Sequence, residues 1–277
     1  MNNKETFVIE PENIDELPIS GDINYNCNYK NLVIFCHGYK GFKDWGCWNI
    51  VSDLFYSKEL NFLKFNFSHN GLTLSKQTKF TDLESFSKNN YSIEVNDLSR
   101  VINYINSNKL NINYENIYII GHSRGSGIAC LSTQYHSNIT KLVSWAGVAS
   151  FKERFPSDKE LKEWRKNGTR YIFNSRTEQK MPHLYEFYTD FINNEEKLTI
   201  KTALFNFKGD FLSCYGSLDQ VIPNRNAFDM AKWATKSSTF GIRTNHTFGS
   251  KHPWNEKQLP IHLNEICLKT IDFLKSD

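Results

Sequence analysis

Residues 117–127 read IYIIGHSRGSG, and this short segment constrains the fold more strongly than any other part of the 277-residue chain. Its apolar first half indicates a buried strand, and a serine between Gly121 and Gly125 follows that strand directly. A helix-like stretch begins straight after the serine, so the backbone has to turn sharply there. Such a turn strains its central residue and needs glycine two positions to either side, where strand and helix pass closely. The segment therefore predicts a sheet in which one strand lifts the Ser123 hydroxyl clear of its end.

The rest of the chain alternates short apolar runs with amphipathic stretches. Residues 93–105 give the clearest helix, because Leu98, Val101 and Ile105 recur at i, i+3 and i+7. We expect strands at residues 6–10, 19–26, 31–36, 61–67, 116–120, 141–149, 210–216 and 239–244. This alternation is typical of an α/β protein with a mostly parallel, doubly wound sheet and helices on both of its faces.

The alternation breaks down between residues 151 and 198, which are rich in charged and aromatic residues. Residues 169–173 are a weak strand candidate, and no other strand is evident there. We interpret 151–198 as a helical cap that covers the sheet's edge, inserted into one core domain made of 1–150 and 199–277. Trp164, Phe173 and Tyr185 of this cap are candidates for an apolar substrate pocket. The alternative is that half or more of the cap's aromatic rings only pack it onto the sheet.

Composition and charge exclude several classes of function. The net charge is +3, from 33 basic and 30 acidic residues, which is too small an excess to predict a nucleic-acid partner. No apolar run approaches the ~18 residues of a membrane span, and the first residues lead into no secretory signal. The six cysteines show no CxxC spacing and fit free thiols in a reducing compartment better than disulfides or a metal site. We expect a cytoplasmic protein without a membrane partner; its oligomeric state stays open, with a homodimer among the alternatives.

A nucleophilic Ser123 needs a base beside it and a third group that orients the base. On a sheet of this kind the acid and then the histidine follow in the sequence, each just after a later strand. Asp219 lies shortly after the strand expected at 210–216. Asp210 precedes that strand and Asp229 falls in a helix-like stretch, so Asp219 is the predicted acid.

Two histidines compete for the role of base. His246 comes two residues after the last expected strand, where a short loop would bring its imidazole over the serine. His252 precedes Pro253, which favours an extended or turn conformation, and we expect it to pack or hydrogen-bond beneath the loop. We therefore predict His246 as the base. His122, inside the motif, should point away from the hydroxyl.

A reaction at Ser123 would pass through an oxyanion, which needs hydrogen-bond donors. The backbone N–H of Arg124 is one candidate, and the N–H of Tyr39, in the loop after residues 31–36, is the other. Lys40, Lys43, Arg124 and Lys251 all lie in loops expected to ring the same mouth. One interpretation is a substrate with an anionic end; the other is a set of solvated basic side chains.

These motifs together resemble the α/β-hydrolase superfamily, and within it small bacterial esterases of the dienelactone-hydrolase-like and cinnamoyl or feruloyl-esterase-like groups. The similar segments are VIFCHGYKGFKDWG, IIGHSRGSG, YGSLDQVIP and NHTFGSKHPW, which occur in the order of that superfamily. The resemblance implies the α/β-hydrolase fold, a triad of Ser123, Asp219 and His246, an oxyanion hole from the backbone of Tyr39 and Arg124, and no metal or organic cofactor. Two departures limit it. Dienelactone hydrolases proper have a cysteine in place of Ser123, and the feruloyl-type enzymes usually carry a glutamine and paired glycines after the serine.

The expected function is therefore a serine hydrolase that cleaves a small-molecule carboxylic ester through an acyl-enzyme. The same triad also serves thioesterases and small-peptide hydrolases, so the sequence leaves the type of bond open. A non-catalytic binding module of the same fold is the remaining alternative. Such modules commonly lose a triad residue, whereas all three positions are filled here.

Overall fold

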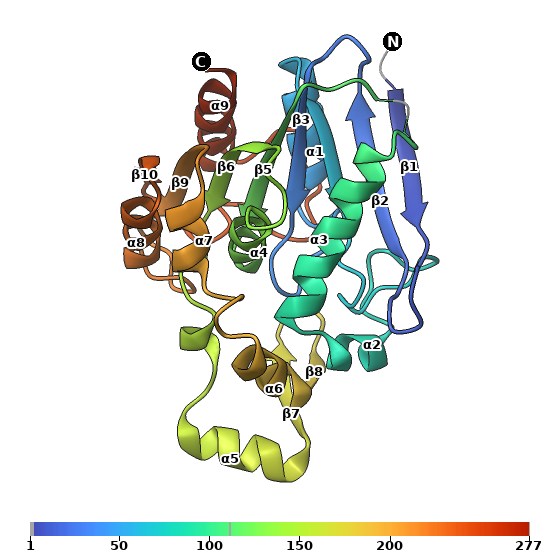
Figure 1. Cartoon of the computed structure of the whole chain (residues 1–277), viewed down its shortest axis with the longest axis vertical. Helices are drawn as coiled ribbons and strands as arrows, with labels where there is room; N and C mark the ends of the chain where they lie inside the picture. Colours follow the sequence, from blue (N-terminus) through green and yellow to red (C-terminus); the bar gives the residue numbers. More distant parts are fainter. Residues whose placement is uncertain (1–2, 111, 277) are drawn as a thin grey trace.

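The computed structural model describes residues 3–110 and 112–276, and an eight-stranded sheet forms its centre (Figure 1). The strands are β1 (Asn3–Ile9), β2 (Ile19–Tyr25), β3 (Asn31–Cys36), β4 (Asn61–Phe65), β5 (Asn116–His122), β6 (Ile139–Trp145), β9 (Asp210–Gly216) and β10 (Lys236–Ile242). Their order across the sheet is β1-β2-β4-β3-β5-β6-β9-β10. From β4 to β10 all neighbours are parallel, and β2 runs antiparallel to both β1 and β4. The mostly parallel sheet predicted from the sequence is confirmed.

Helices cover both faces of this sheet because its central strands are apolar on both sides. In β3, Leu32 and Ile34 belong to one buried cluster, whereas Val33 and Phe35 belong to the other. The helices over the first face are α3 (Tyr91–Asn106), α4 (Arg124–Ser132), α7 (Ile200–Asn206) and α8 (Arg225–Trp233); those over the second are α1 (Trp48–Ser57) and α9 (Ile261–Lys275). A short helix, α2 (Leu83–Lys88), precedes α3.

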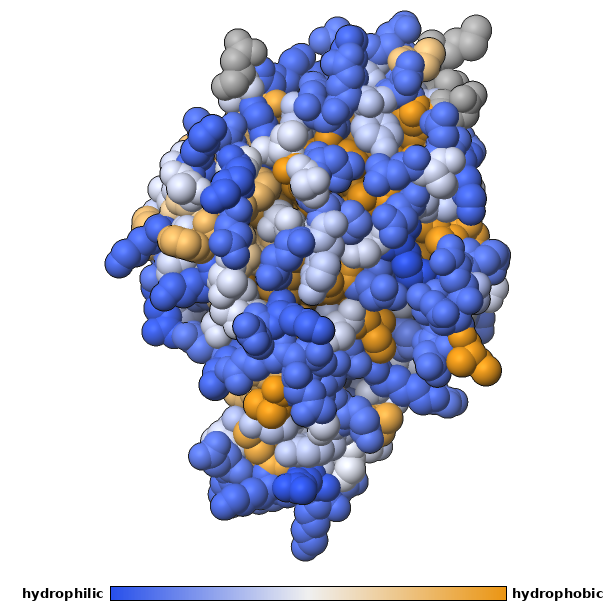
Figure 2. Space-filling model, viewed as in Figure 1, coloured by the Kyte–Doolittle hydropathy of each residue, from blue (hydrophilic) through white to orange (hydrophobic). Residues whose placement is uncertain are grey.

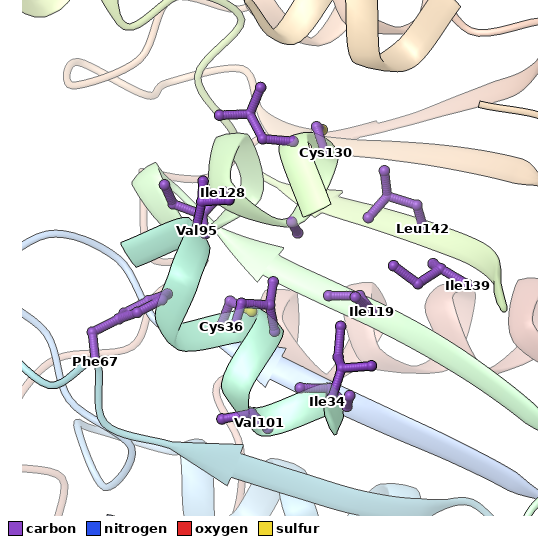
Figure 3. Packing of buried hydrophobic residues seen from close by; sticks show 14 of the residues in the cluster. Ile34, Cys36, Phe67, Val95, Val101, Ile119, Ile128, Cys130, Ile139 and Leu142 are labelled. Carbon is purple, nitrogen blue, oxygen red and sulfur yellow. The ribbon is translucent and has the colours of Figure 1, made fainter. Parts of the chain in front are cut away.

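Side chains of the first face interlock between the sheet and two helices. Figure 3 shows Ile34 and Ile119 from the strands in the same buried cluster as Val101 of α3 and Ile128 of α4. The apolar residues whose spacing predicted a helix at 93–105 form the buried side of α3. Because α4 begins directly after Ser123, this packing also fixes the start of the helix that follows the serine.

Residues 151–198 form a layer beyond the carboxyl ends of the parallel strands, at the bottom of Figure 1. Its elements are a 3₁₀ turn (Lys152–Arg154), α5 (Asp158–Asn167), β7 (Thr169–Asn174), β8 (Gln179–Leu184) and α6 (Glu186–Asn193). The expected helical cap does contain helices, but it also includes an antiparallel hairpin of β7 and β8. The weak candidate at 169–173 is its first strand. The second was missed because its sequence, QKMPHL, includes Pro182 and lacks the alternation of a strand. A proline is tolerated there since each strand of a two-stranded sheet has one unpaired edge.

Polar side chains cover most of the surface seen in Figure 2, and the apolar residues on that face are scattered. None of the described helices is both long and apolar enough to cross a membrane. The cysteines are free thiols, of which Cys27 is exposed and the others are buried.

Candidate active site

Ser123 lies at the junction of β5 and α4 in a backbone conformation that side chains rarely adopt, with φ 56° and ψ −120°. Its N–H donates to the Trp145 carbonyl at 2.8 Å, which ties the turn to β6. Both flanking positions require glycine because there is no room for a side chain. A Cβ on Gly121 would lie 2.3 Å from Ser126 Cα, and one on Gly125 would lie 2.4 Å from the Cys36 carbonyl oxygen. The surrounding strands and helix therefore hold the serine in a strained turn.

Three side chains from different loops meet at this turn. His246 Nε2 lies 3.0 Å from Ser123 Oγ, and His246 Nδ1 lies 2.7 Å from Asp219 Oδ2. Asp219 follows β9 and His246 follows β10, which are parallel neighbours, so both loops leave the same edge of the sheet as Ser123. When Nδ1–H donates to the carboxylate, Nε2 is the acceptor for the serine hydroxyl. The arrangement can thus remove a proton from Ser123.

The Asp219 carboxylate is held in its ionised form. Its other oxygen, Oδ1, accepts from the N–H groups of Val221 (2.7 Å) and Ile222 (2.9 Å). Burial disfavours the charge, but the hydrogen bonds from His246 and from the two amides outweigh it and keep the carboxyl pKa below its ordinary value. An ionised Asp219 fixes the tautomer of the imidazole and stabilises a positive charge that forms on it.

Two backbone amides beside Ser123 can donate to an oxyanion. Gly38, next to Tyr39, is so close that a Cβ on it would lie 3.0 Å from Ser123 Cβ. Arg124 is the first residue of α4, where the N–H has no partner within the helix. Neither amide is among the backbone donors that find an acceptor in the turns and loops of the described residues. Tyr39 and Arg124 therefore flank the serine with free donors.

No protein-family model and no curated protein sequence matches this chain. Solved structures do. Est1E from Butyrivibrio proteoclasticus is 14% identical over 97% of both chains, with a TM-score of 0.71. Alpha/beta hydrolase domain-containing protein 10 from mouse is 13% identical over 98% of both chains, with a TM-score of 0.72. A dienelactone hydrolase from Anabaena variabilis is 12% identical, covers 99% of this chain and 97% of its own, and has a TM-score of 0.60.

The protein has the α/β-hydrolase fold. At such low identity the likeness establishes the fold alone, and the chemistry has to be argued from the geometry of this chain. In the α/β-hydrolase fold, the serine turn between β5 and α4 is the nucleophile elbow.

Two further histidines near the elbow have different positions. The His122 side chain donates from Nε2 to the His246 carbonyl at 3.1 Å, so it supports the loop that carries His246. Burial, with the His246 ring close by, lowers the pKa of His122 to about 3 and keeps it neutral. This role has no signal in the sequence. His252 is separate from the serine: its Nδ1 accepts from the Gly46 N–H at 3.0 Å and its ring packs on Phe42.

The side chains of Tyr39 and Arg124 are held against each other. The Arg124 guanidinium stacks on the Tyr39 ring at 4.0 Å from its centroid and pairs with Glu94 of α3 at 3.2 Å. The Tyr39 hydroxyl shares a 2.6 Å hydrogen bond with Nε2 of His183, on β8 of the cap. Glu94 and His183 were missed by the sequence analysis because only the folded chain brings them to the elbow.

A cavity of about 470 Å³ opens between the α/β-hydrolase core and the cap, with Ser123 and His246 in its wall. Of the aromatic pocket candidates, Trp164 lines it. Phe173 and Tyr185 are not part of its wall. Phe173 is 58% exposed on the outer side of β7, and Tyr185 packs edge-to-face on Trp164. The position of Phe173 follows from the hairpin, whose alternation turns Ile172 rather than Phe173 toward the cavity.

The basic residues expected at the mouth divide into two groups. Lys40 and Arg124 line the cavity. Lys43 does not, because its ammonium is buried in ion pairs with Asp22 and Asp44, each at 2.6 Å. Lys251 is exposed and outside the cavity wall. Among the described residues, no group of three or more His, Cys, Asp or Glu side chains is arranged to hold a metal ion.

Proposed function

We propose that this protein is a serine hydrolase that cleaves carboxylic esters through an acyl-enzyme. The observation that carries the proposal is the hydrogen-bonded series Asp219–His246–Ser123, with spacings of 2.7 and 3.0 Å, whose serine and histidine lie in the wall of the cavity. The strained elbow and the two free amides beside it supply the other parts that acyl transfer needs.

The reaction follows from these positions. Ser123 Oγ attacks the ester carbonyl while its proton passes to His246 Nε2, and the oxyanion accepts hydrogen bonds from the Tyr39 and Arg124 amides. The intermediate collapses, the C–O bond to the alcohol breaks, and His246 gives its proton to the departing alkoxide. Water then attacks the acyl-enzyme with His246 as the base, which releases the acid and restores Ser123.

The structural neighbours favour an ester, rather than a thioester or a peptide, as the substrate. One neighbour is Est1E with ferulic acid bound, and others are esterases from Rhodothermus marinus and Pyrococcus furiosus. Those titles describe the neighbours, and the elbow itself is equally suited to thioesters and amides. The type of bond is therefore part of the test.

The test is hydrolysis of p-nitrophenyl esters from acetate to long-chain acyl groups, beside the thioester and anilide of the preferred acid. Ser123→Ala and His246→Ala should each lower kcat by about 10⁴-fold or more, because such residues act as a unit. His252→Ala should retain activity within about tenfold, since it only packs and hydrogen-bonds in the loop of Gly46. A fluorophosphonate probe should label native protein and not Ser123→Ala. If neither protein is labelled and no substrate is turned over, the protein is a binding module of this fold.

A further inference from the structure

The wall of the cavity between the core and the cap carries charge of a single sign. Five basic side chains line it, and no aspartate or glutamate among the described residues does. The five are Lys40, Arg124, Arg154, Arg170 and Arg176. This is a local property, because the chain as a whole has 33 basic and 30 acidic residues. Low-dielectric walls concentrate the field of such a cluster and attract an anion into the cavity.

Two of these cations already have a carboxylate partner outside the wall. Arg124 pairs with Glu94 at 3.2 Å, and Arg170 pairs with Glu160 at 3.5 Å. One carboxylate charge thus balances each of these two guanidinium groups. The unbalanced charge therefore lies with the other three residues.

Lys40, Arg154 and Arg176 have no ion pair among the described residues. Arg176 donates from Nη2 to the Lys40 carbonyl at 2.7 Å and lies over the Trp45 ring, which places the two cations together. Burial, and then the charges of Arg176 and Arg124, lower the pKa of Lys40. An anion placed among them would relieve this repulsion.

His183, which also lines the cavity, is 2% exposed, and its Nδ1 has no hydrogen-bond partner among the described residues. The nitrogen itself is shielded from the cavity, so the residues that can meet a substrate's charge are the cations of the wall.

We propose that the cavity binds esters that carry a carboxylate, which Arg154, Arg176 and Lys40 hold while Ser123 reaches the ester carbonyl. This inference rests on the proposed function and adds the substrate class to it. A carboxylate fits because guanidinium groups bind its two oxygens with a matching fork of N–H donors.

Matched ester pairs test the proposal and locate the carboxylate. The first pair is the 4-methylumbelliferyl monoester of adipic acid and its methyl-capped diester, which differ only at the end of the acyl chain. The second pair is 4-carboxyphenyl butanoate and 4-carbamoylphenyl butanoate, which differ in the leaving group. The kcat/KM ratio within each pair is measured for native protein and for Arg154→Gln and Arg176→Gln. Arg165→Gln is the control, since Arg165 is an exposed arginine of α5 outside the cavity wall.

The charged ester of at least one pair should be favoured by about tenfold or more, as expected for hydrogen bonds to a charged group. Arg154→Gln and Arg176→Gln should each reduce that ratio by about threefold or more, mainly through KM, whereas Arg165→Gln keeps it. Raising the salt from about 0.05 to 0.5 M should also reduce it. Ratios near one in both pairs, with the neutral esters still cleaved in a Ser123-dependent way, would overturn the substrate class and leave the proposed function intact.

If no ester is cleaved, binding of an anion to the cavity is measured by calorimetry. Adipate and 4-hydroxybenzoate are titrated into Ser123→Ala and into the same protein with Arg154→Gln. Saturable binding that weakens by about threefold or more with Arg154→Gln supports the site without the reaction. Absent binding, or binding that Arg154→Gln does not weaken, refutes it.

Discussion

At the scale of single residues, Ser123 has a backbone conformation that residues other than glycine rarely adopt. Its φ of 56° is maintained in two ways. The strand, the helix and β3 pass so closely at Gly121 and Gly125 that a Cβ would clash there, and the Ser123 N–H donates to the Trp145 carbonyl of β6. A nucleophile held in this way does not have to be ordered when substrate arrives, so less of the barrier is entropic. The remaining requirement is a base in the correct tautomer, which depends on Asp219.

Asp219→Asn should therefore lower kcat for p-nitrophenyl esters by about 10³- to 10⁴-fold, with KM little changed. The amide is isosteric, but it carries no charge and can present an N–H to His246 Nδ1, which favours the wrong tautomer. The rate at which a fluorophosphonate labels Ser123 should fall together with kcat. Asp229→Asn, on α8 outside the cavity wall, is the charge-matched control and should retain the native rate. Equal rates for the two variants would contradict the role of Asp219.

In the proposed mechanism Glu94 is a positioning residue that does not contact the substrate. Its carboxylate pairs with the Arg124 guanidinium, which stacks on Tyr39, so one ion pair holds the two residues proposed to donate to the oxyanion. Glu94→Gln should lower kcat by about three- to thirtyfold through a looser oxyanion hole, with a smaller change in KM. Glu84→Gln, at an exposed pair with Lys88, is the control. A Glu94→Gln enzyme with native kcat would show that the brace has no catalytic consequence.

At the scale of elements, the β7–β8 hairpin is attached to the oxyanion loop through few contacts. The Tyr39 hydroxyl bonds to His183, and Arg176 bonds to the Lys40 carbonyl. The cap and the loop that carries one oxyanion donor are thereby coupled. Opening of the cap would disturb the Tyr39 amide as well as admit substrate.

Tyr39→Phe should loosen this attachment, because it leaves both ring nitrogens of buried His183 without a partner. We expect a loss of about 1–2 kcal/mol in local stability, seen as faster hydrogen exchange across residues 169–184. Tyr171→Phe removes a hydroxyl from the same hairpin, but Tyr171 is 61% exposed, so its exchange should match native protein. Protection of the hairpin that is unaltered in Tyr39→Phe would show that other contacts hold the cap.

Elements also differ in how far the sequence predicted them. The parallel strands other than the exposed edge strand β10 were predictable because each is a short apolar run that is largely buried. The order of the strands placed Ser123, Asp219 and His246 at one edge of the sheet. β8 was not predictable, since its sequence includes Pro182 and lacks the alternating polarity of a strand, and its pairing with β7 decides its structure. The cap arginines of the cavity wall, Arg154, Arg170 and Arg176, were not predicted for the same reason. Their convergence depends on how the cap packs over the elbow, and no local pattern encodes that.

At the scale of the whole molecule, the chain buries several groups whose charge is expensive to desolvate. Four histidines are nearly inaccessible, at 2–7% exposure, and burial is the main cause that lowers each of their pKa values. They are His37 and His69, with pKa values of about 4, and His122 and His183, with values of about 3. In the unfolded chain they would titrate near the ordinary value of 6.5.

This difference makes the fold sensitive to mild acid. Between pH 6.5 and about 3 the unfolded state binds protons that the folded state excludes, so the contribution of these histidines to stability is full above pH 6.5 and falls as the pH drops through that window. Each pKa unit of difference is worth about 1.4 kcal/mol per histidine. Asp97 acts in the opposite sense. Burial raises its pKa to about 7, so the folded state takes up a proton there first and offsets part of the loss.

The urea midpoint should therefore be steady from pH 8 to 7 and decline from pH 6.5 to 5, above the range in which ordinary carboxylates titrate. His183→Gln should make the decline shallower, because one proton taken up on unfolding is removed. Asp97→Asn should make the decline steeper, since the variant loses the compensating carboxyl group. The asparagine keeps the shape of the side chain and can still accept hydrogen bonds from Ser68. The two variants thus shift one slope in opposite directions, which a general loss of stability cannot do. A midpoint constant between pH 7 and 5, or equal slopes in all three proteins, would mean that these buried groups do not couple protonation to folding.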